Sequence, residues 1–208
     1  MPGLSDDDPG EILHELGKAG ARRAKVWLDS TTRIESSWSV YDSFGKNRLT
    51  YPWPHGGKSY SYDLGGVFHG GDLHQQSFLV ECKKYSNPGQ GGHFDKFLAQ
   101  SYALLTTYPM LGDHFVWITW HPFRITTWSE LYSEDKIVEA ILAERERVFG
   151  LDATSDDEVV KALIDRDAVA TLARTCWVIV LSDKQETLVI SREDRAEVMR
   201  LRDLRDEN

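Results

Sequence analysis

The sequence predicts an α/β protein whose core runs helix, three-stranded antiparallel meander, helix, strand, followed by a helical and β-hairpin extension. Two patterns indicate this class. Segments dense in β-branched and aromatic residues alternate with segments whose apolar residues recur at helical spacing, and glycine- or proline-rich turns separate them. The 208 residues are enough for one ordinary domain. We therefore expect a core over residues 1–130 and an extension over residues 131–208, packed together in one compact unit.

The first part of the chain is expected to hold the first helix and the first strand. Apolar residues at helical spacing predict one or two helices from Glu11 to about Trp38. Short strand segments follow at residues 38–41 and 48–51, and Pro52 begins the turn that ends them.

A hairpin, a helix and a strand are predicted next. Residues 60–68 and 77–85 are rich in strand formers and flank the turn at residues 70–72, which favours a hairpin. Residues 93–108 carry large apolar side chains at helical intervals, and a proline follows them. Residues 114–120 are dense in strand formers and should form a buried strand.

The last third of the chain is predicted to be mostly helical. Amphipathic patterns indicate helices at residues 133–149 and 155–175. Two apolar runs, residues 177–181 and 187–190, are separated by a short polar turn and predict a second hairpin. Ser191 should begin a final charged helix.

Composition argues for a cytoplasmic protein that does not enter a membrane. Hydrophobic residues make up 41%, and the mean hydropathy is −0.42. No apolar run approaches the roughly 18–20 residues that span a bilayer. The early segment Ser5-Asp6-Asp7-Asp8 is acidic, whereas a secretory signal starts with basic residues. Cys82 and Cys176 lie in or beside apolar runs, which indicates buried thiols rather than a disulfide framework.

Charge is distributed unevenly along the chain. The net charge is −9, but residues 21–130 hold nine acidic and eleven basic side chains, whereas residues 131–208 hold nineteen acidic and twelve basic ones. A polyanion such as DNA should therefore approach the middle of the chain only locally and weakly. The acidic carboxy-terminal helices are instead suited to docking a protein partner or a second copy of the chain.

The most specific chemical feature is Asp63 followed, one hairpin later, by Glu81-Cys82-Lys83. Side chains alternate along a strand, so Glu81 and Lys83 should project from the same face and Cys82 from the other. The midpoint between positions 63 and 81 is residue 72, inside the predicted turn, so Asp63 should lie opposite Glu81.

Two carboxylates this close repel each other unless a proton, a base or a metal ion lies between them. Hard oxygen ligands with room for water suit Mg²⁺ or Mn²⁺. An ammonium beside the ion, here that of Lys83, can orient or help deprotonate a water molecule. This is the layout that hydrolysis of a phosphodiester bond requires.

On these residues the chain resembles the PD-(D/E)xK nuclease superfamily, which has the restriction-endonuclease-like fold. The resemblance covers roughly residues 11–120 and includes the order of the core elements. It implies a Mg²⁺- or Mn²⁺-dependent deoxyribonuclease, with DNA as substrate. It further implies that Asp63, Glu81 and the main-chain carbonyl of Cys82 are metal ligands, and that Lys83 is the base that positions water.

The same resemblance points to two supporting residues. Glu35, late in the first predicted helical region, is similar to the extra acidic residue of many members, and Gln100 is similar to a glutamine that some members hold near the scissile phosphate. The chain departs from the pattern in having Tyr62 rather than proline before Asp63, and Leu104 where exonuclease-type members often have tyrosine. We therefore expect an endonuclease rather than an exonuclease.

Alternatives to a nuclease remain open at this stage. The same fold can act without catalysis, as a binding or assembly subunit of a nucleic-acid-processing complex. Glu81 and Lys83 can form a plain surface ion pair, and an acid two positions before a lysine occurs again at Glu134-Asp135-Lys136, where it is expected on a solvated helix start. A metal-independent enzyme would use His93 or His121.

A zinc site finds little support in the sequence. The histidines and cysteines show none of the paired spacings that zinc sites typically have.

Overall fold

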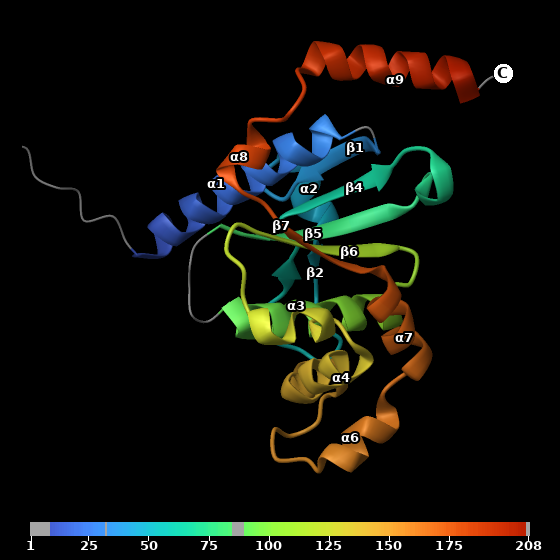
Figure 1. The fold of residues 1–208 in the computed structure, drawn as a ribbon. Coiled ribbons are helices and arrows are strands. Elements are labelled where there is room, and N and C mark those ends of the chain that lie inside the picture. Colours follow the sequence, from blue (N-terminus) through green and yellow to red (C-terminus); the bar gives the residue numbers. More distant parts are fainter. Residues whose placement is uncertain (1–8, 32, 85–89, 207–208) are drawn as a thin grey trace, which may run out of the picture.

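A mixed five-stranded sheet forms the centre of the molecule, with helices on both faces (Figure 1). The computed structural model describes residues 9–31, 33–84 and 90–206. The sheet has the strand order β1-β4-β5-β6-β7, and its strands are β1 (Ile34–Ser39), β4 (Leu64–Phe68), β5 (Ser77–Lys83), β6 (His114–Thr119) and β7 (Cys176–Val180). Strand β4 pairs antiparallel with both β1 and β5, whereas the pairs β5/β6 and β6/β7 are parallel.

The helices and minor elements connect these strands. The α-helices are α1 (Pro9–Ser30), α2 (Ser43–Arg48), α3 (Gln90–Thr107), α4 (Glu134–Ala143), α5 (Arg145–Phe149), α6 (Asp157–Leu163), α7 (Arg166–Thr175), α8 (Asp183–Glu186) and α9 (Arg192–Asp206). A separate two-stranded sheet pairs β2 (Thr50–Tyr51) with β3 (Tyr60–Ser61), and short 3₁₀ helices lie at Gly71–Leu73 and Ile125–Glu130.

Two apolar clusters lie on the two faces of the sheet. On one face, Ala21, Ala24 and Leu28 recur at helical spacing on α1 and pack against Val80 of β5 and Ile118 of β6. On the other face, α3 and α7 cover the alternate residues of the same strands, and α4 packs against α3 and α7. This second cluster includes Leu79, Phe97, Phe115, Trp117, Ile137, Ile141, Val169 and Leu172. The strict alternation along β5 and β6 therefore determines which side chains face which helix.

Several expectations are confirmed by these elements. The chain is a mixed α/β protein, and the hairpin at residues 60–85, the helix at 93–108 and the strand at 114–120 correspond to β4 with β5, α3 and β6. In chain order, one helix, three antiparallel strands, one helix and one strand are present, with α2, β2 and β3 inserted after the first strand. Both cysteines are buried free thiols.

The first helix ends earlier than expected. It ends at Ser30, and residues 34–39 form strand β1 instead of continuing the helix to Trp38. The hydroxyl of Ser30 donates to the Trp27 carbonyl and that of Thr31 donates to the Leu28 carbonyl. Hydroxyl side chains compete in this way for backbone groups, which weakens a helix near its end. Glu35 consequently lies on a strand.

The predicted second hairpin is also wrong. Residues 176–180 form β7, which pairs in parallel with β6 at the edge of the main sheet, and residues 187–190 are not a strand. The polar segment between them is helix α8, whose amino terminus is capped by the hydroxyl of Ser182. Glu186 of α8 is held by Arg23 of α1 and by Trp120. Residues 176–180 thus add a fifth strand to the main sheet instead of pairing with residues 187–190.

Candidate functional site

The candidate site lies at the open end of the β4–β5 hairpin. The two strands pair Leu64 with Val80 and Gly65 with Leu79. Continuing this register by one residue brings Asp63 opposite Glu81. The register predicted from the turn at residues 70–72 is therefore confirmed. Asp63 directly precedes β4, and Glu81 lies within β5.

The Asp63 side chain takes the place of the next main-chain hydrogen-bond acceptor between β4 and β5. Its Oδ2 accepts a hydrogen bond from the main-chain N–H of Cys82 at 2.8 Å, and its Oδ1 accepts one from the Tyr41 hydroxyl at 3.3 Å. Its main-chain carbonyl accepts from Val40 N–H at 3.0 Å. The chain after β1, the chain before β4 and the end of β5 are therefore joined at this one aspartate.

Glu81 and Lys83 lie on one face of β5, as alternation predicts. Their side chains form an ion pair, with 2.6 Å between Lys83 Nζ and Glu81 Oε1. The two side chains are 17% and 16% exposed, so the pair is neither free in solvent nor sealed in the core. Cys82 points to the opposite face, where it packs in the α1-side cluster.

The electrostatics of the site centre on Asp63. Burial, and after it the negative charge of Glu81, raise the pKa of the Asp63 carboxyl to about 7, against the opposing effects of Lys83 and of the two hydrogen bonds. Burial followed by the Asp63 charge likewise raises the pKa of the Tyr41 hydroxyl, which keeps that group a hydrogen-bond donor. Two carboxyl groups and one ammonium thus act on each other within this site.

The start of α3 contributes basic groups to the same region. Burial lowers the pKa of His93, and the neighbouring ammonium groups of Lys83 and Lys96 lower it further, while Glu81 has the opposite effect. His93 is therefore close enough to the Glu81–Lys83 pair to be influenced by both of its charges.

Gln100 lies farther along α3, two helical turns after His93. Its main-chain carbonyl accepts a hydrogen bond from the Tyr60 hydroxyl at 3.2 Å, and the neighbouring Ser101 hydroxyl lies 3.2 Å from that of Tyr62. These contacts hold the middle of α3 against the segment that leads into Asp63. A role for the Gln100 side chain near a phosphate stays a prediction.

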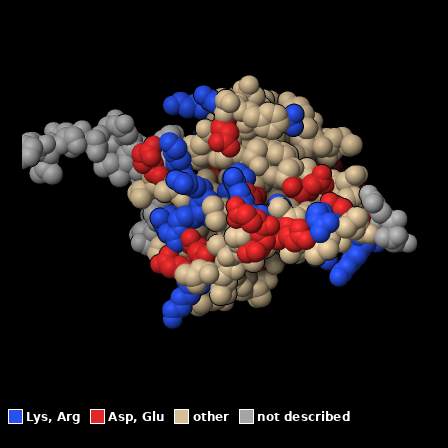
Figure 2. Space-filling model, turned by 90° about the horizontal axis from the view of Figure 1, so that it is seen from above, with Lys and Arg blue, Asp and Glu red and all other residues tan. Residues whose placement is uncertain are grey.

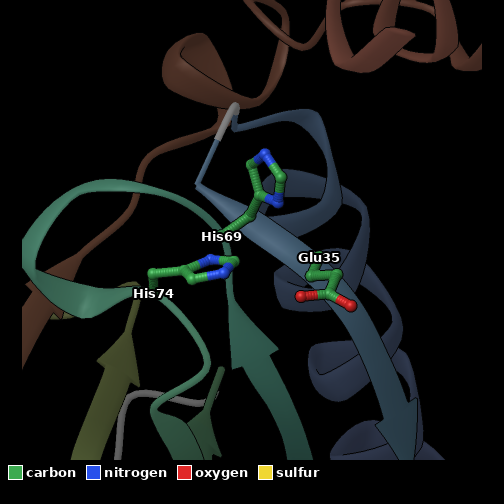
Figure 3. Close-up of side chains that lie close together, drawn as sticks. All are labelled: Glu35, His69 and His74. Atoms are coloured by element: carbon green, nitrogen blue, oxygen red, sulfur yellow. The ribbon is translucent and has the colours of Figure 1, made fainter. Parts of the chain in front are cut away.

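Glu35 does not join this group of residues. Its neighbour Ile34 pairs with Phe68 at the far end of β4, whereas Asp63 adjoins the end at which Leu64 pairs with Ser39. Glu35 lies instead beside His69 and His74 (Figure 3). The expectation that Glu35 supports Asp63 and Glu81 rested on a helix reaching residue 35, and β1 carries the side chain to the other end of the sheet.

The sequence reasoning missed one feature of this site and one feature at the other end of the sheet. Tyr41, which donates to Asp63, was expected inside a strand at residues 38–41, whereas β1 ends at Ser39 and Tyr41 follows it. The approach of His69 to His74 had a visible signal, because the two histidines flank the predicted turn at residues 70–72 and a turn brings its flanking residues together.

Comparison with known proteins adds no assignment. No family model matches the chain, and neither does any curated protein or solved structure. Among the helices of the described residues, none combines the length and the apolar character needed to cross a membrane.

Proposed function

We propose that this chain is a metal-dependent nuclease of the PD-(D/E)xK type that hydrolyses phosphodiester bonds in DNA, as an endonuclease. The observation that carries the proposal is the partly buried Asp63 carboxyl at the hairpin end that also holds the Glu81–Lys83 pair. The order of the core elements, with the acids at the second and third strands of the antiparallel meander, supports the same function.

The residues present fit a Mg²⁺ or Mn²⁺ ion. Burial and Glu81 oppose the ionisation of Asp63, and a divalent cation between the two acids removes that repulsion. Both groups offer oxygen atoms, which these ions prefer. Asp63 and Glu81 would hold the ion, together with the main-chain carbonyl of Cys82. Because Lys83 Nζ already contacts Glu81 Oε1, an ion on Glu81 would use the other carboxylate oxygen, share Oε1 or displace the ammonium.

The chain's own groups have separable roles in this proposal. The Cys82 N–H and the Tyr41 hydroxyl fix the Asp63 carboxyl, so that its oxygens keep one orientation. The Lys83 ammonium orients a water molecule beside the phosphate and carries positive charge into a site where negative charge develops. A bound Mg²⁺ or Mn²⁺ supplies the Lewis acidity that activates water and neutralises charge on the phosphate.

DNA as substrate is supported by the local charge near the site. Lys83 lies within the site, and Lys96 lies on the second turn of α3 near His93. Lys84, in contrast, lies on the α1 side of the sheet, with its Cβ close to Gly20. Lys96 is suited to contact a phosphate next to the scissile bond. Basic and acidic side chains are intermixed on the face seen in Figure 2, and no continuous basic stripe crosses that face. In this proposal, basic groups close to the site, rather than a stripe on that face, contact the substrate.

A cleavage assay on supercoiled plasmid and on linear duplex DNA tests the proposal. We expect cleavage of both with Mg²⁺ or Mn²⁺, none in EDTA, and a loss of at least about 100-fold in Asp63→Ala, Glu81→Ala and Lys83→Ala. Glu134→Ala and Lys136→Ala are matched controls, since these two residues have the same spacing on α4. They should cleave like the wild type.

Other outcomes of the assay separate the alternatives. Cleavage that continues in EDTA would indicate metal-independent chemistry, for which His93→Ala is the next variant. If the purified chain cuts no DNA under any metal but binds it equally well before and after the three substitutions, the nuclease proposal fails and a binding subunit is left.

A further inference from the structure

We propose that Glu35, His69 and His74 form a second metal site, for a borderline transition-metal ion of the Zn²⁺ class, separate from the Asp63–Glu81 site. One ligand atom from each of these three residues lies within 4.8 Å of the other two. Two imidazoles and one carboxylate are a donor set that proteins use for such ions. Figure 3 shows both rings close to the Glu35 side chain.

Local structure explains why the three side chains meet. His69 follows β4, and the short 3₁₀ helix Gly71–Leu73 reverses the chain so that His74 returns beside it. The two rings are perpendicular, with 5.7 Å between their centroids. Glu35 comes from β1 at the place where the β1–β4 register shifts, between Ile34 and Ser36. The three ligands thus come from two adjacent strand ends, which gives the cluster a backbone frame.

The two ring nitrogens of His69 lie in different environments. Its Nε2 is buried and has no hydrogen-bond partner, and the carboxylate of Asp203 on α9 lies 3.7 Å away. Because Nε2 is covered, Nδ1 is the atom that remains for an ion. An imidazole bound to a metal usually donates its other N–H to a carboxylate, which fixes the ring. A small shift of the Asp203 carboxylate toward His69 Nε2 provides that hydrogen bond.

His74 needs one rearrangement to bind an ion. Its Nδ1 accepts a hydrogen bond from Gly70 N–H at 3.1 Å, so Nε2 is the atom left for the metal. Binding at Nε2 places the proton on Nδ1, and Gly70 N–H then turns to solvent. The ring is exposed, so water replaces the lost bond. A tetrahedral ion with bonds of about 2.0–2.1 Å sets its ligand atoms about 3.4 Å apart, which requires only a modest contraction of the cluster.

The surrounding charge opposes all cations, and the type of donor atom decides which ions bind. A cavity of about 240 Å³ beside His69 is lined by Arg33, Arg202 and Arg205. These arginines oppose the approach of any cation, so affinity has to come from the strength of the individual metal–ligand bonds. Imidazole nitrogens bind Zn²⁺, Co²⁺ and Ni²⁺ far better than Mg²⁺ or Ca²⁺, which prefer oxygen ligands. The site therefore selects against the ion proposed for Asp63 and Glu81.

Calorimetric titration of Zn²⁺ into the untagged full chain, with millimolar Mg²⁺ present, tests the proposal. We expect one Zn²⁺ per chain, with affinity weakened at least about tenfold in Glu35→Gln and about 100-fold in His74→Ala, and about tenfold in Asp203→Asn. Glu35 and His74 are exposed, so these variants should fold, which circular dichroism checks. Co²⁺ gives a second readout, because its visible absorption should appear in the wild type and vanish in His74→Ala.

Two controls make the outcome decisive. Asp63→Asn alters the other site and should leave Zn²⁺ affinity unchanged, and His121→Ala removes an exposed histidine outside the cluster. Zn²⁺ binding that is lost in Asp63→Asn, or that is unchanged in both Glu35→Gln and His74→Ala, overturns the proposal. Neither result depends on whether the chain cuts DNA.

Discussion

The carboxylate of Asp63 accepts a hydrogen bond from the main-chain N–H of Cys82 at 2.8 Å, and this bond ties the first acid of the candidate site to the strand that carries the second. A buried main-chain N–H that lost this acceptor would be costly. The Asp63 side chain therefore completes the β4–β5 hairpin as well as serving the site, and substitutions at this position have to separate the two roles.

Asp63→Asn separates the structural role of this side chain from the role of its charge, since asparagine keeps an acceptor oxygen for Cys82 but carries no charge. In the wild type the folded carboxyl has its pKa raised to about 7 from the model-compound value of 3.8. The folded state therefore binds more protons than the unfolded state between these values, and the free energy of unfolding falls as pH rises through that window. Other groups titrate in the same range, so the quantity to measure is a difference: in EDTA between pH 5 and 8, the wild type should lose stability to denaturant relative to Asp63→Asn as pH rises. Parallel profiles would contradict the shift.

Mg²⁺ or Mn²⁺ should stabilise the fold by binding the native state alone. At an ion concentration of about 100 times Kd, linkage predicts about 2.7 kcal/mol. Thermal unfolding with and without the ion measures this gain. It should disappear in Glu81→Gln and persist in Glu134→Gln, which has the same change at the solvated motif of α4. An equal gain in both variants would show that the ion binds elsewhere.

His114 should make stability depend on pH independently of any metal. Its Nε2 lies 2.6 Å from Gln76 Oε1, and its Nδ1 accepts from the indole N–H of Trp177. Burial lowers the pKa of this ring below the usual 6.5. The stabilising effect is thus complete above pH 6.5 and is lost as pH falls, because the unfolded chain takes up the proton first. Relative to the wild type, His114→Gln should gain stability as pH falls from 7 to 5; a constant difference would refute the assignment.

Gly66 should tolerate no side chain. A Cβ at this position of β4 would overlap the Phe78 ring and lie 2.5 Å from the Ser36 carbonyl oxygen. We expect Gly66→Ala to lower the free energy of unfolding by about 1–3 kcal/mol. Gly92 on α3 is the matched control, since a Cβ there meets nothing within 4 Å and alanine should stabilise the helix by about 0.5–1 kcal/mol. Urea denaturation of both variants checks the difference in sign.

DNA affinity of the isolated chain should be weak and sensitive to salt. The net charge is −9, and the basic side chains near the site are local ones such as Lys83 and Lys96. Fluorescence anisotropy with Asp63→Asn, used to avoid cleavage, should show affinity falling roughly tenfold or more between about 50 and 200 mM salt. Tight binding that survives high salt would contradict this distribution of charge.

The sequence was sufficient to predict the β4–β5 hairpin and to predict that Asp63 faces Glu81 across it. A turn signal at residues 70–72 and the two-residue period of a strand define the register, and both are local properties. Glu35 and β7 could not be placed in the same way. Whether residue 35 lies on a helix depends on hydroxyl groups at Ser30 and Thr31 that end α1, and residues 176–180 are as suited to a hairpin as to a sheet edge.

Strand β7 is synthesised long after its partner β6, and this affects how the chain folds during synthesis. Residues 120–175 separate β6 from its parallel partner, so during synthesis the edge of β6 carries unpaired N–H and C=O groups until residue 180 has left the ribosome. Such an edge invites pairing with another nascent chain. Truncation within α7 should therefore produce aggregates rather than a smaller folded protein, and chaperones that shield strand edges should raise the yield of the whole chain.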